Sequence, residues 1–447
     1  MFGEPNFTVP WMEKKAGINS KGVEMLLELE VKNWRSFQHL KFSTVATREQ
    51  KHSYRVPKLE KYRIRVLPVT AIYGGNASGK TNMFKALAFM QRFVTAVNLQ
   101  SQGIGIEPFA LSREMREKPS EFKVNIFAEG TIYEYGFVAS KKEVLQEWLI
   151  KVLPRREQVL FERKGDVFEF PTHFQERERF RGIAEGTTPH TLFLTNSVSQ
   201  KGQEFFPIYR WFLGTLTLIA PDTRFGPYET FLDKTSPLLR SGKEFLQDFD
   251  TGICDLKGED VSFENLPIDK NIFENLPSGA IARFDYLTDK YFVRRDDNGD
   301  ITVKKLVTSH QTIDGDGVVN FGMGLESDGS RRLIDLYPML EQLVTKTVPK
   351  VYMVDELDRS LHYLATRGFL ERYLDSCDKE TRSQLIFTTH DLLLMDQEFL
   401  RRDEMWITER KKNGSKIISL TEYQQRCDTD LVKSYLDGRF GGIPRVY

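Results

Sequence analysis

The sequence has few cysteines, no surplus of either charge and no long apolar run. Its 447 residues include three cysteines, Cys254, Cys377 and Cys427, which are too few and too scattered for a disulfide framework or a zinc site. Lysine plus arginine and aspartate plus glutamate both total 63, which excludes a global electrostatic attraction to nucleic acid or membranes. No apolar run approaches the roughly 18 residues of a membrane span, and residues 1–24 lack the apolar core of a secretory signal. We therefore expect a cytoplasmic protein with no membrane partner.

One short stretch fits the phosphate-binding pattern G-x-x-x-x-G-K-[ST] at every position. It follows a β-branched and aromatic strand candidate, Val69 to Tyr73, and precedes a helix candidate from Asn82 to Val97. In such a loop the glycines let backbone N–H groups surround phosphate oxygens, the lysine reaches the β- and γ-phosphates, and the threonine hydroxyl binds Mg²⁺. The predicted nucleotide-binding residues are Gly74, Gly75, Asn76, Ala77, Ser78, Gly79, Lys80, Thr81 and Asn82, with Thr81 also at the metal.

Two later strand ends carry the chemistry of hydrolysis. The run VYMVDE ends in Asp355 and Glu356, where one acid can hold Mg²⁺ through water and the next can act as general base toward an attacking water. The run QLIFTTHD carries His390, which we expect to contact a γ-phosphate, because ligands bind at the carboxyl ends of strands in open α/β sheets. We predict ATP hydrolysis, with Lys80, Glu356 and His390 as catalytic residues and Asp355 as a metal-binding residue.

A polar loop before a later helix offers further phosphate contacts. Residues 322–330 are rich in glycine and serine and precede leucines at helical spacing, so backbone N–H groups and a serine hydroxyl there could contact phosphate. The same composition is typical of an ordinary helix cap. These residues alone leave both interpretations open.

Together, the motifs resemble those of the ATP-binding-cassette (ABC) ATPases of the chromosome-maintenance and break-repair type. The corresponding segments are GGNASGKT as the phosphate loop, VYMVDE as the Walker B strand, LDRSLH as the D-loop and FTTHD as the switch-histidine segment. The resemblance implies that Ser327 and Gly329 belong to a signature loop, which completes the site of the opposite protomer in a head-to-tail dimer. It also implies that Arg35, in NWRSF, contacts phosphate. Neither Gln100 nor Gln102 is assigned as the family's Q-loop glutamine.

A narrower resemblance covers nearly the whole chain. The segments MLLELEVKNWRSF, YGGNASGKTNMFKAL, PSEFKVNIF, ESDGSRRLIDLYP, DELDRSLH and LDGRFGGIP are similar to those of bacterial phage-defence ATPases of the RloA and AbiLi kind, within the overcoming-lysogenization-like AAA-family ATPases. This resemblance implies abortive infection, an ATP-dependent homodimer or higher oligomer, and a separately encoded effector such as a nuclease. A phage protein trigger or a nucleic acid is a further expected partner.

Two features that the sequence lacks narrow the class of ATPase to which it can belong. No long heptad-patterned stretch separates the two ATPase halves, so coiled-coil arms are not expected. The 57 residues from Asp391 to Tyr447 are too few for the nuclease domain that overcoming-lysogenization enzymes carry in the same chain. We therefore expect any nuclease to be a separate protein.

These observations predict an α/β fold, namely an ABC-type P-loop NTPase head with a mixed sheet, flanking helices and an inserted β-rich and helical subdomain. The expected divisions are an N-terminal extension over 1–24, a first ATPase half over 25–110, the insertion over 111–319 and a second ATPase half over 320–447. Apolar alternation predicts a small N-terminal sheet over 27–42, and antiparallel hairpins at 122–138, 159–170 and 291–307.

We favour an ATPase that senses or signals phage infection, but two alternative functions remain open. A DNA repair or recombination ATPase without coiled coils is supported by Arg155, Arg156, Arg177, Arg179 and Arg181, although such runs are usually solvated faces. DNA-stimulated hydrolysis would favour it. The other alternative is a scaffold clamped by ATP with little hydrolysis, and the carboxylate of Glu356 argues against that.

Overall fold

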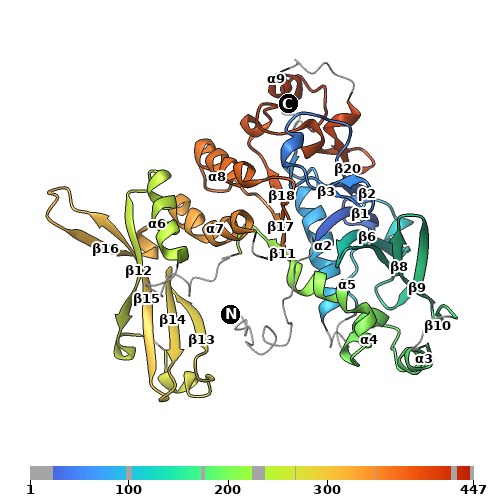
Figure 1. Cartoon of the computed structure of the whole chain (residues 1–447), viewed down its shortest axis with the longest axis horizontal. Coiled ribbons are helices and arrows are strands. Elements are labelled where there is room, and N and C mark those ends of the chain that lie inside the picture. Colours follow the sequence, from blue (N-terminus) through green and yellow to red (C-terminus); the bar gives the residue numbers. More distant parts are fainter. Residues whose placement is uncertain are drawn as a thin grey trace. The chain divides into compact units, whose positions relative to one another are not determined.

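The computed structural model describes residues 24–96, 103–172, 177–223, 237–266, 268–346, 348–423 and 430–442. The N-terminal extension up to residue 23, together with Gln100, Gln102 and Cys427, lies outside these ranges. The chain divides into two compact units, whose helices and strands are labelled in Figure 1. Of the described residues, the smaller unit takes in those from 237 to 341 and from 359 to 368, and the larger unit takes in the rest.

The larger unit contains a six-stranded sheet in which five neighbouring strands are parallel. Every residue of β5, β17 and β18 is buried, as expected for short apolar runs that are covered on both faces. The antiparallel β20 forms one edge. In spatial order the strands are β11 (Leu216–Ile219), β17 (Val351–Val354), β18 (Gln384–Thr389), β5 (Val69–Tyr73), β19 (Met405–Lys411) and β20 (Gly414–Ser419).

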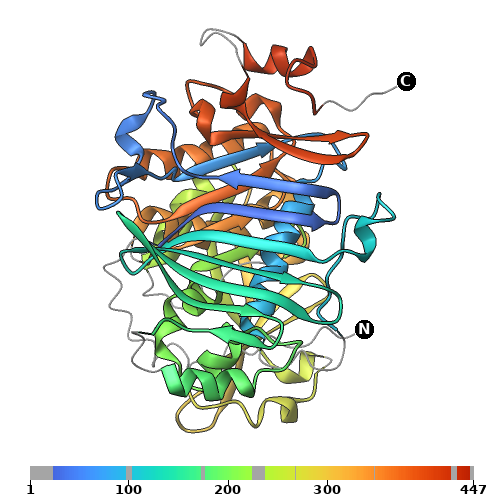
Figure 2. The same cartoon turned by 90° about the vertical axis from the view of Figure 1, so that its right-hand side faces the viewer.

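A second sheet of the larger unit has seven antiparallel strands, which Figure 2 shows side by side in blue, teal and green. The hairpins predicted at 122–138 and 159–170 are confirmed as neighbouring strands. The N-terminal strands do not form a small sheet of their own, because β1 pairs with β6 over Met25–Lys32. Periodicity within one segment cannot reveal such a distant partner. The order is β10 (Val167–Glu169), β9 (Arg156–Lys164), β8 (Val144–Leu153), β7 (Thr131–Ala139), β6 (Ser120–Ala128), β1 (Met25–Trp34) and β2 (Phe37–Ser43).

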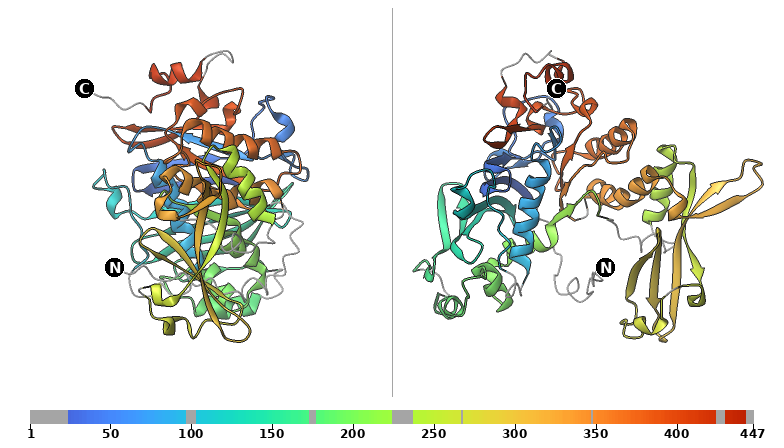
Figure 3. Two further views of the ribbon diagram at one scale, coloured as in Figure 1. Left: turned by 90° about the vertical axis from the view of Figure 1, so that its left-hand side faces the viewer. Right: turned by 180° about the vertical axis from the view of Figure 1, so that it is seen from behind.

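Helix α2 (Lys80–Thr95) lies between these two sheets and supplies much of the core (Figure 3, right). Its buried side chains, among them Phe89 and Phe93, share one apolar cluster with residues of β1 and β6 and with residues of β5 and β17. Gln384 at the start of β18 adds a polar tie, because its buried amide group bonds both the N–H and the C=O of Leu26 in β1. The other helices wholly within this unit include α3 (Arg177–Glu185), α4 (Phe193–Ser199), α5 (Phe206–Arg210), the π-helical turn Trp211–Thr215 and α9 (Leu431–Leu436).

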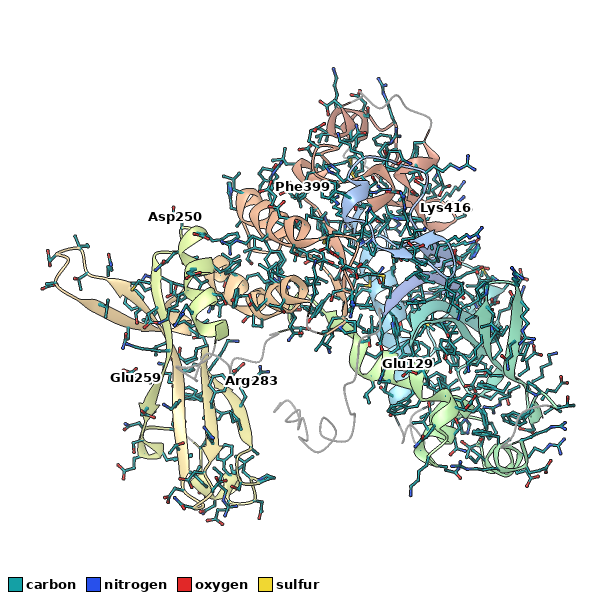
Figure 4. All side chains as sticks on the ribbon, in the orientation of Figure 1. Glu129, Asp250, Glu259, Arg283, Phe399 and Lys416 are labelled. Carbon is teal, nitrogen blue, oxygen red and sulfur yellow. The ribbon has the colours of Figure 1, made fainter. Side chains whose placement is uncertain are left out.

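Buried and half-buried charges attach the antiparallel strands to the helices of the larger unit. The carboxylate of Glu147 on β8 is fully buried and accepts hydrogen bonds from the N–H groups of Phe193 and Leu194, at 2.6 and 3.0 Å, where α4 begins. Arg210 of α5 lies 3.1 Å from Glu129, which is labelled in Figure 4 at the β6–β7 turn. The strands beyond β6 are therefore anchored within the larger unit.

The smaller unit is built on an antiparallel sheet, drawn in yellow and gold in Figure 3. The long strand β15 pairs with β14 over residues 301–305 and with β16 over residues 307–311, which confirms the hairpin predicted at 291–307. Its elements are α6 (Pro237–Asp248), β12 (Ile253–Val261), β13 (Ile281–Tyr286), β14 (Asp289–Arg295), β15 (Ile301–Gln311) and β16 (Val318–Gly322). Helices α7 (Asp328–Thr345) and α8 (Tyr363–Ser376) begin in this unit.

The predicted fold class, a P-loop NTPase head with a mixed sheet and flanking helices, is confirmed by this arrangement. Within the described parts of the chain, no helix is both long and apolar enough to cross a lipid bilayer.

Candidate functional site

The glycine-rich loop connects β5 directly to α2, and the helix begins at Lys80. Gly74 and Gly79 have φ angles of 153° and 122°, in a region that favours glycine. Space is also short at Gly74, because a Cβ there would lie 2.2 Å from Oγ1 of Thr408. The loop backbone is therefore closely fitted against β19.

Two contacts from outside the motif hold the loop. Oγ1 of Thr408 donates to the carbonyl of Tyr73 at 3.1 Å and lies 2.6 Å from Oγ of Ser78. The N–H of Gly75 donates to the carbonyl of Gly442 at 3.1 Å. Neither Thr408 nor Gly442 was predicted as a site residue. Gly442 lies in the LDGRFGGIP segment, which offered a signal, whereas Thr408 lies in no motif.

The side chain of Lys80 turns back over the loop. Its ammonium group donates to the carbonyl of Gly74 and, at 3.2 Å, to that of Gly75. It also lies 3.4 Å from Nδ1 of His390. The lysine and the histidine, which are predicted from motifs 310 residues apart, thus meet in the structure.

Burial lowers the pKa of Lys80 to about 8, and the carboxylates of Asp355, Asp358 and Glu356 oppose this shift. Carbonyl oxygens solvate an ammonium group less well than water does, so the buried charge is only partly compensated. A negatively charged group placed over the loop would favour the protonated lysine. The site is therefore electrostatically suited to an anion such as a phosphate.

Asp355 follows β17 and is completely buried. Its Oδ1 accepts a hydrogen bond from Oγ1 of Thr388 at 2.7 Å, whereas its Oδ2 is buried and finds no hydrogen-bond partner among the described residues. A buried carboxylate oxygen without a donor is costly unless a cation or an ordered water compensates it. This donor set fits a hydrated Mg²⁺, a hard cation that prefers oxygen ligands.

Glu356 and His390 lie at the solvent-accessible part of the site. Glu356 has a left-handed φ of 52°, and its N–H donates to Oγ1 of Thr388 at 2.8 Å. Its Oε1 lies 3.8 Å from Nε2 of His390, and both side chains are about one-third exposed, at 36% and 38%. The N–H of His390 in turn donates to Oδ2 of Asp358 at 3.2 Å. Thr388 thus supports both acids, and it was not predicted as a site residue although it lies in the FTTHD segment.

The sheet explains why these residues meet. Strands β17, β18 and β5 are parallel neighbours, with Val354 opposite Phe387 and Thr389 opposite Tyr73. The residues that follow each strand therefore emerge at the same edge of the sheet. This edge brings together the phosphate loop, the two acids and His390.

Arg35 lies in the turn between β1 and β2, with a left-handed φ of 48°. It forms an ion pair with Glu107, 2.5 Å between Nη2 and Oε1. Both residues line a pocket of about 350 Å³ that also touches Ala77 of the phosphate loop and Asn82 of α2. The structure thus places Arg35 beside the loop, and Glu107 is a further residue that no motif indicated.

Ser327 and Gly329 lie in the smaller unit, at the start of α7. Oγ of Ser327 accepts a hydrogen bond from the N–H of Ser330 at 3.0 Å, which is the geometry of a helix N-cap. A Cβ on Gly329 would lie 2.9 Å from the carbonyl oxygen of Ser360. Their part in a nucleotide site stays a prediction.

Two of the five arginines that suggested nucleic-acid binding, Arg179 and Arg181, make contacts within the chain. Arg181 pairs with Glu178 at 2.9 Å, and Arg179 donates to the carbonyls of Gln200 and Lys201. These two side chains are therefore not a free basic surface.

Comparisons with known proteins found one matching family and several solved structures that are similar to this chain. The family described as AAA domain, putative AbiEii toxin, Type IV TA system matches residues 69–396, a span that runs from β5 past His390. The SMC head domain from Thermotoga maritima is 14% identical, with a TM-score of 0.36, covering 88% of this chain and 98% of that chain. The SmcHead bound to the C-winged helix domain of ScpA is 15% identical, with a TM-score of 0.35, covering 89% and 99%. No curated protein matches the chain.

Proposed function

Since this chain belongs to the AAA-domain family described as putative AbiEii toxin, Type IV TA system, we propose that it binds and hydrolyses ATP with Mg²⁺. One observation carries the proposal. The loop lysine Lys80, the switch candidate His390 and the acid Glu356 form a chain of contacts of 3.4 and 3.8 Å at one edge of a parallel sheet. Ligands of open α/β sheets bind at this edge.

Each residue has a separate part in the proposed reaction. The ammonium group of Lys80 neutralises the β- and γ-phosphates. Oε1 of Glu356 takes the proton from the attacking water, and its partial exposure gives water access to it. His390 contacts the γ-phosphate from the end of β18 and orients the carboxylate of Glu356. The backbone N–H groups of the phosphate loop supply further hydrogen-bond donors for phosphate oxygens.

The residues for Mg²⁺ would be Thr81, which is exposed on the first turn of α2, and Asp355, whose Oδ2 is buried without a donor among the described residues. When bound, Mg²⁺ supplies charge neutralisation between phosphate oxygens and fixes their position. Thr388 keeps the carboxylate of Asp355 oriented through the other oxygen.

We further propose that Ser327 and Gly329 act on the site of a second copy, in a head-to-tail dimer that controls a separately encoded toxic effector during phage infection. The motif resemblance supports both the dimer and the separate effector, and the family description, which names a putative toxin of a Type IV TA system, supports a toxic outcome. The effector is proposed to be a nuclease. Phage plating on cells that carry the gene with and without its neighbouring reading frames tests this part.

The substitution Lys80→Ala tests the proposed ATPase activity directly. Loss of the only ammonium group bonded to the loop carbonyls of Gly74 and Gly75 among the described residues should reduce ATP turnover by about a hundredfold or more. The matched control is Lys85→Ala, which removes an exposed lysine from the same helix and should leave turnover unchanged. Phosphate release by the purified variants is the measurement, and equal turnover in Lys80→Ala and wild type would contradict the proposal.

A further inference from the structure

A pocket of about 350 Å³ adjoins the phosphate loop of the larger unit. The residues that matter here are Arg35, Ala77, Asn82, Glu107, Leu111 and Arg410, all of which line it. Ala77 belongs to the loop and Asn82 to the first turn of α2, so a group bound over the loop would lie next to this pocket. Arg35 and Glu107 supply charges of opposite sign to the same wall.

The turn that carries Arg35 is fastened to the helix that follows the loop. Nε1 of Trp34 donates to the carbonyl of Asn82 at 2.9 Å, and Nδ2 of Asn82 donates to Oγ of Ser36 at 2.8 Å. Oγ of Ser415 donates to the same Ser36 hydroxyl at 2.9 Å. The residues on both sides of Arg35 are thus held, and the Arg35 side chain lines the pocket beside the loop.

The carboxylate of Glu107 forms an ion pair with the guanidinium group of Arg35. Its Oε1 lies 2.5 Å from Nη2 of Arg35, while Nε of Arg35 is buried and has no hydrogen-bond partner among the described residues. The backbones are tied as well, because the N–H of Arg35 donates to the carbonyl of Glu107 at 2.9 Å. The Glu107 side chain is 55% exposed, so this ion pair is solvated and can separate at little cost.

We propose that Glu107 sets the affinity of the nucleotide site by competing with phosphate for Arg35. An arginine fork binds a carboxylate and a phosphate with the same geometry, so one guanidinium edge cannot serve both fully. A nucleotide must therefore displace the Glu107 carboxylate before Arg35 can contact it. This inference rests on the proposed function, because it assumes a nucleotide over the loop.

Glu107→Gln tests the proposal without touching the loop or the acids. The amide keeps the shape and the backbone bond to Arg35 but loses the charge, so the affinity for AMP-PNP with Mg²⁺ should rise by about threefold to fivefold. Titration calorimetry on the full chain is the measurement. The matched control is Glu114→Gln, which removes the same charge from an exposed ion pair with Lys118 away from the pocket lining, and it should leave the affinity unchanged.

A double-mutant cycle with Arg35→Ala identifies the route of the effect. Arg35→Ala should weaken binding, and adding Glu107→Gln to it should bring no gain. A gain that persists without Arg35 would overturn the proposal, because Glu107 would then repel the nucleotide directly. Equal or weaker binding by Glu107→Gln at an unchanged unfolding midpoint would also overturn it. If wild type binds no AMP-PNP at all, the proposed ATPase function fails instead, and the two failures are thereby distinguished.

Discussion

Lys80 is a buried cation whose pKa of about 8 lies within the accessible pH range. Below pH 8 most free molecules carry the ammonium group, and above it most carry the neutral amine. Because phosphate binds the ammonium form, binding above pH 8 requires uptake of a proton. We predict that the affinity for AMP-PNP falls as the pH rises through 8, with a slope approaching about tenfold per pH unit.

Titration calorimetry between pH 7 and 10 measures this dependence. Lys80→Arg is the informative control, because a guanidinium group stays charged throughout this range and should remove the decline. Lys85→Ala, on the same helix, should retain it. A flat profile for wild type would mean that Lys80 does not exchange its proton in this range.

Glu356 is the second residue whose charge can be removed without a change in side-chain shape. Glu356→Gln preserves the shape of the side chain and the backbone bond to Thr388, but an amide is a very poor base. We predict that the variant binds ATP as wild type does and hydrolyses it about a hundredfold or more slowly. Binding and turnover are measured on one preparation, and a folded variant that no longer binds ATP would count against the role of general base.

At the scale of elements, the junction of β5 and α2 depends on glycine for two separate reasons. Gly74 has a φ angle suited to glycine, and a Cβ there would lie 2.2 Å from Oγ1 of Thr408. Gly165, in the β9–β10 turn, has a φ angle of 60° but open space around its Cβ position. A comparison of substitutions at Gly165 and Gly74 therefore distinguishes the cost of backbone strain alone from the added cost of a steric clash.

We predict that Gly165→Ala lowers the free energy of unfolding by about 1 kcal/mol and leaves nucleotide binding unchanged. Gly74→Ala should lower it by about 2 kcal/mol or more and abolish AMP-PNP binding, because β19 and the loop must separate to make room. Denaturant unfolding and calorimetry measure the two effects. Equal destabilisation by both substitutions would show that the contact with Thr408 does not constrain the loop.

For the whole molecule, the prediction concerns which copy supplies Ser327. If Ser327 completes the partner's site, a Lys80→Ala copy paired with a Ser327→Arg copy contains one site lacking both groups and one site lacking neither. We therefore predict that mixed dimers of two inactive variants trap ATP, as the closed two-fold symmetry of such a dimer requires. Retention of labelled ATP by mixed dimers isolated with two different tags is the measurement.

Two controls accompany this test. A double variant mixed with wild type carries one defect in each mixed site and should trap no ATP. Ser262→Arg places the same bulk and charge at another exposed capping serine of the smaller unit, and its homodimer should trap ATP as wild type does. Mixed dimers of Lys80→Ala and Ser327→Arg that retain no more ATP than either homodimer would refute the role of Ser327 in trans.

The local features of this protein could be predicted from its amino-acid sequence alone. The strand predicted from Val69 to Tyr73 has these boundaries in the structure, the glycine-rich loop follows it, and three hairpins form where alternation placed them. Backbone conformation, side-chain alternation and glycine requirements depend on neighbours in the chain, so they can be read from a short segment. The position of His390 at the end of a predicted strand indicated that it lies at the ligand-binding edge with the phosphate loop, because ligands bind at the carboxyl ends of strands in open α/β sheets.

Which distant segments meet could not be predicted from the sequence and is seen in the folded chain. The pairing of β1 with β6 merged two predicted sheets into one, since a strand's pattern shows which face is buried but not its partner. Thr408, Gly442 and Glu107 reach the loop and its pocket through one or two contacts each between distant segments. A single hydroxyl, carbonyl or carboxylate leaves no periodicity in a sequence. Gly442 lies in a segment that the motif resemblance covers, but its contact with the loop, like the contacts of Thr408 and Glu107, forms only when the chain has folded around the site.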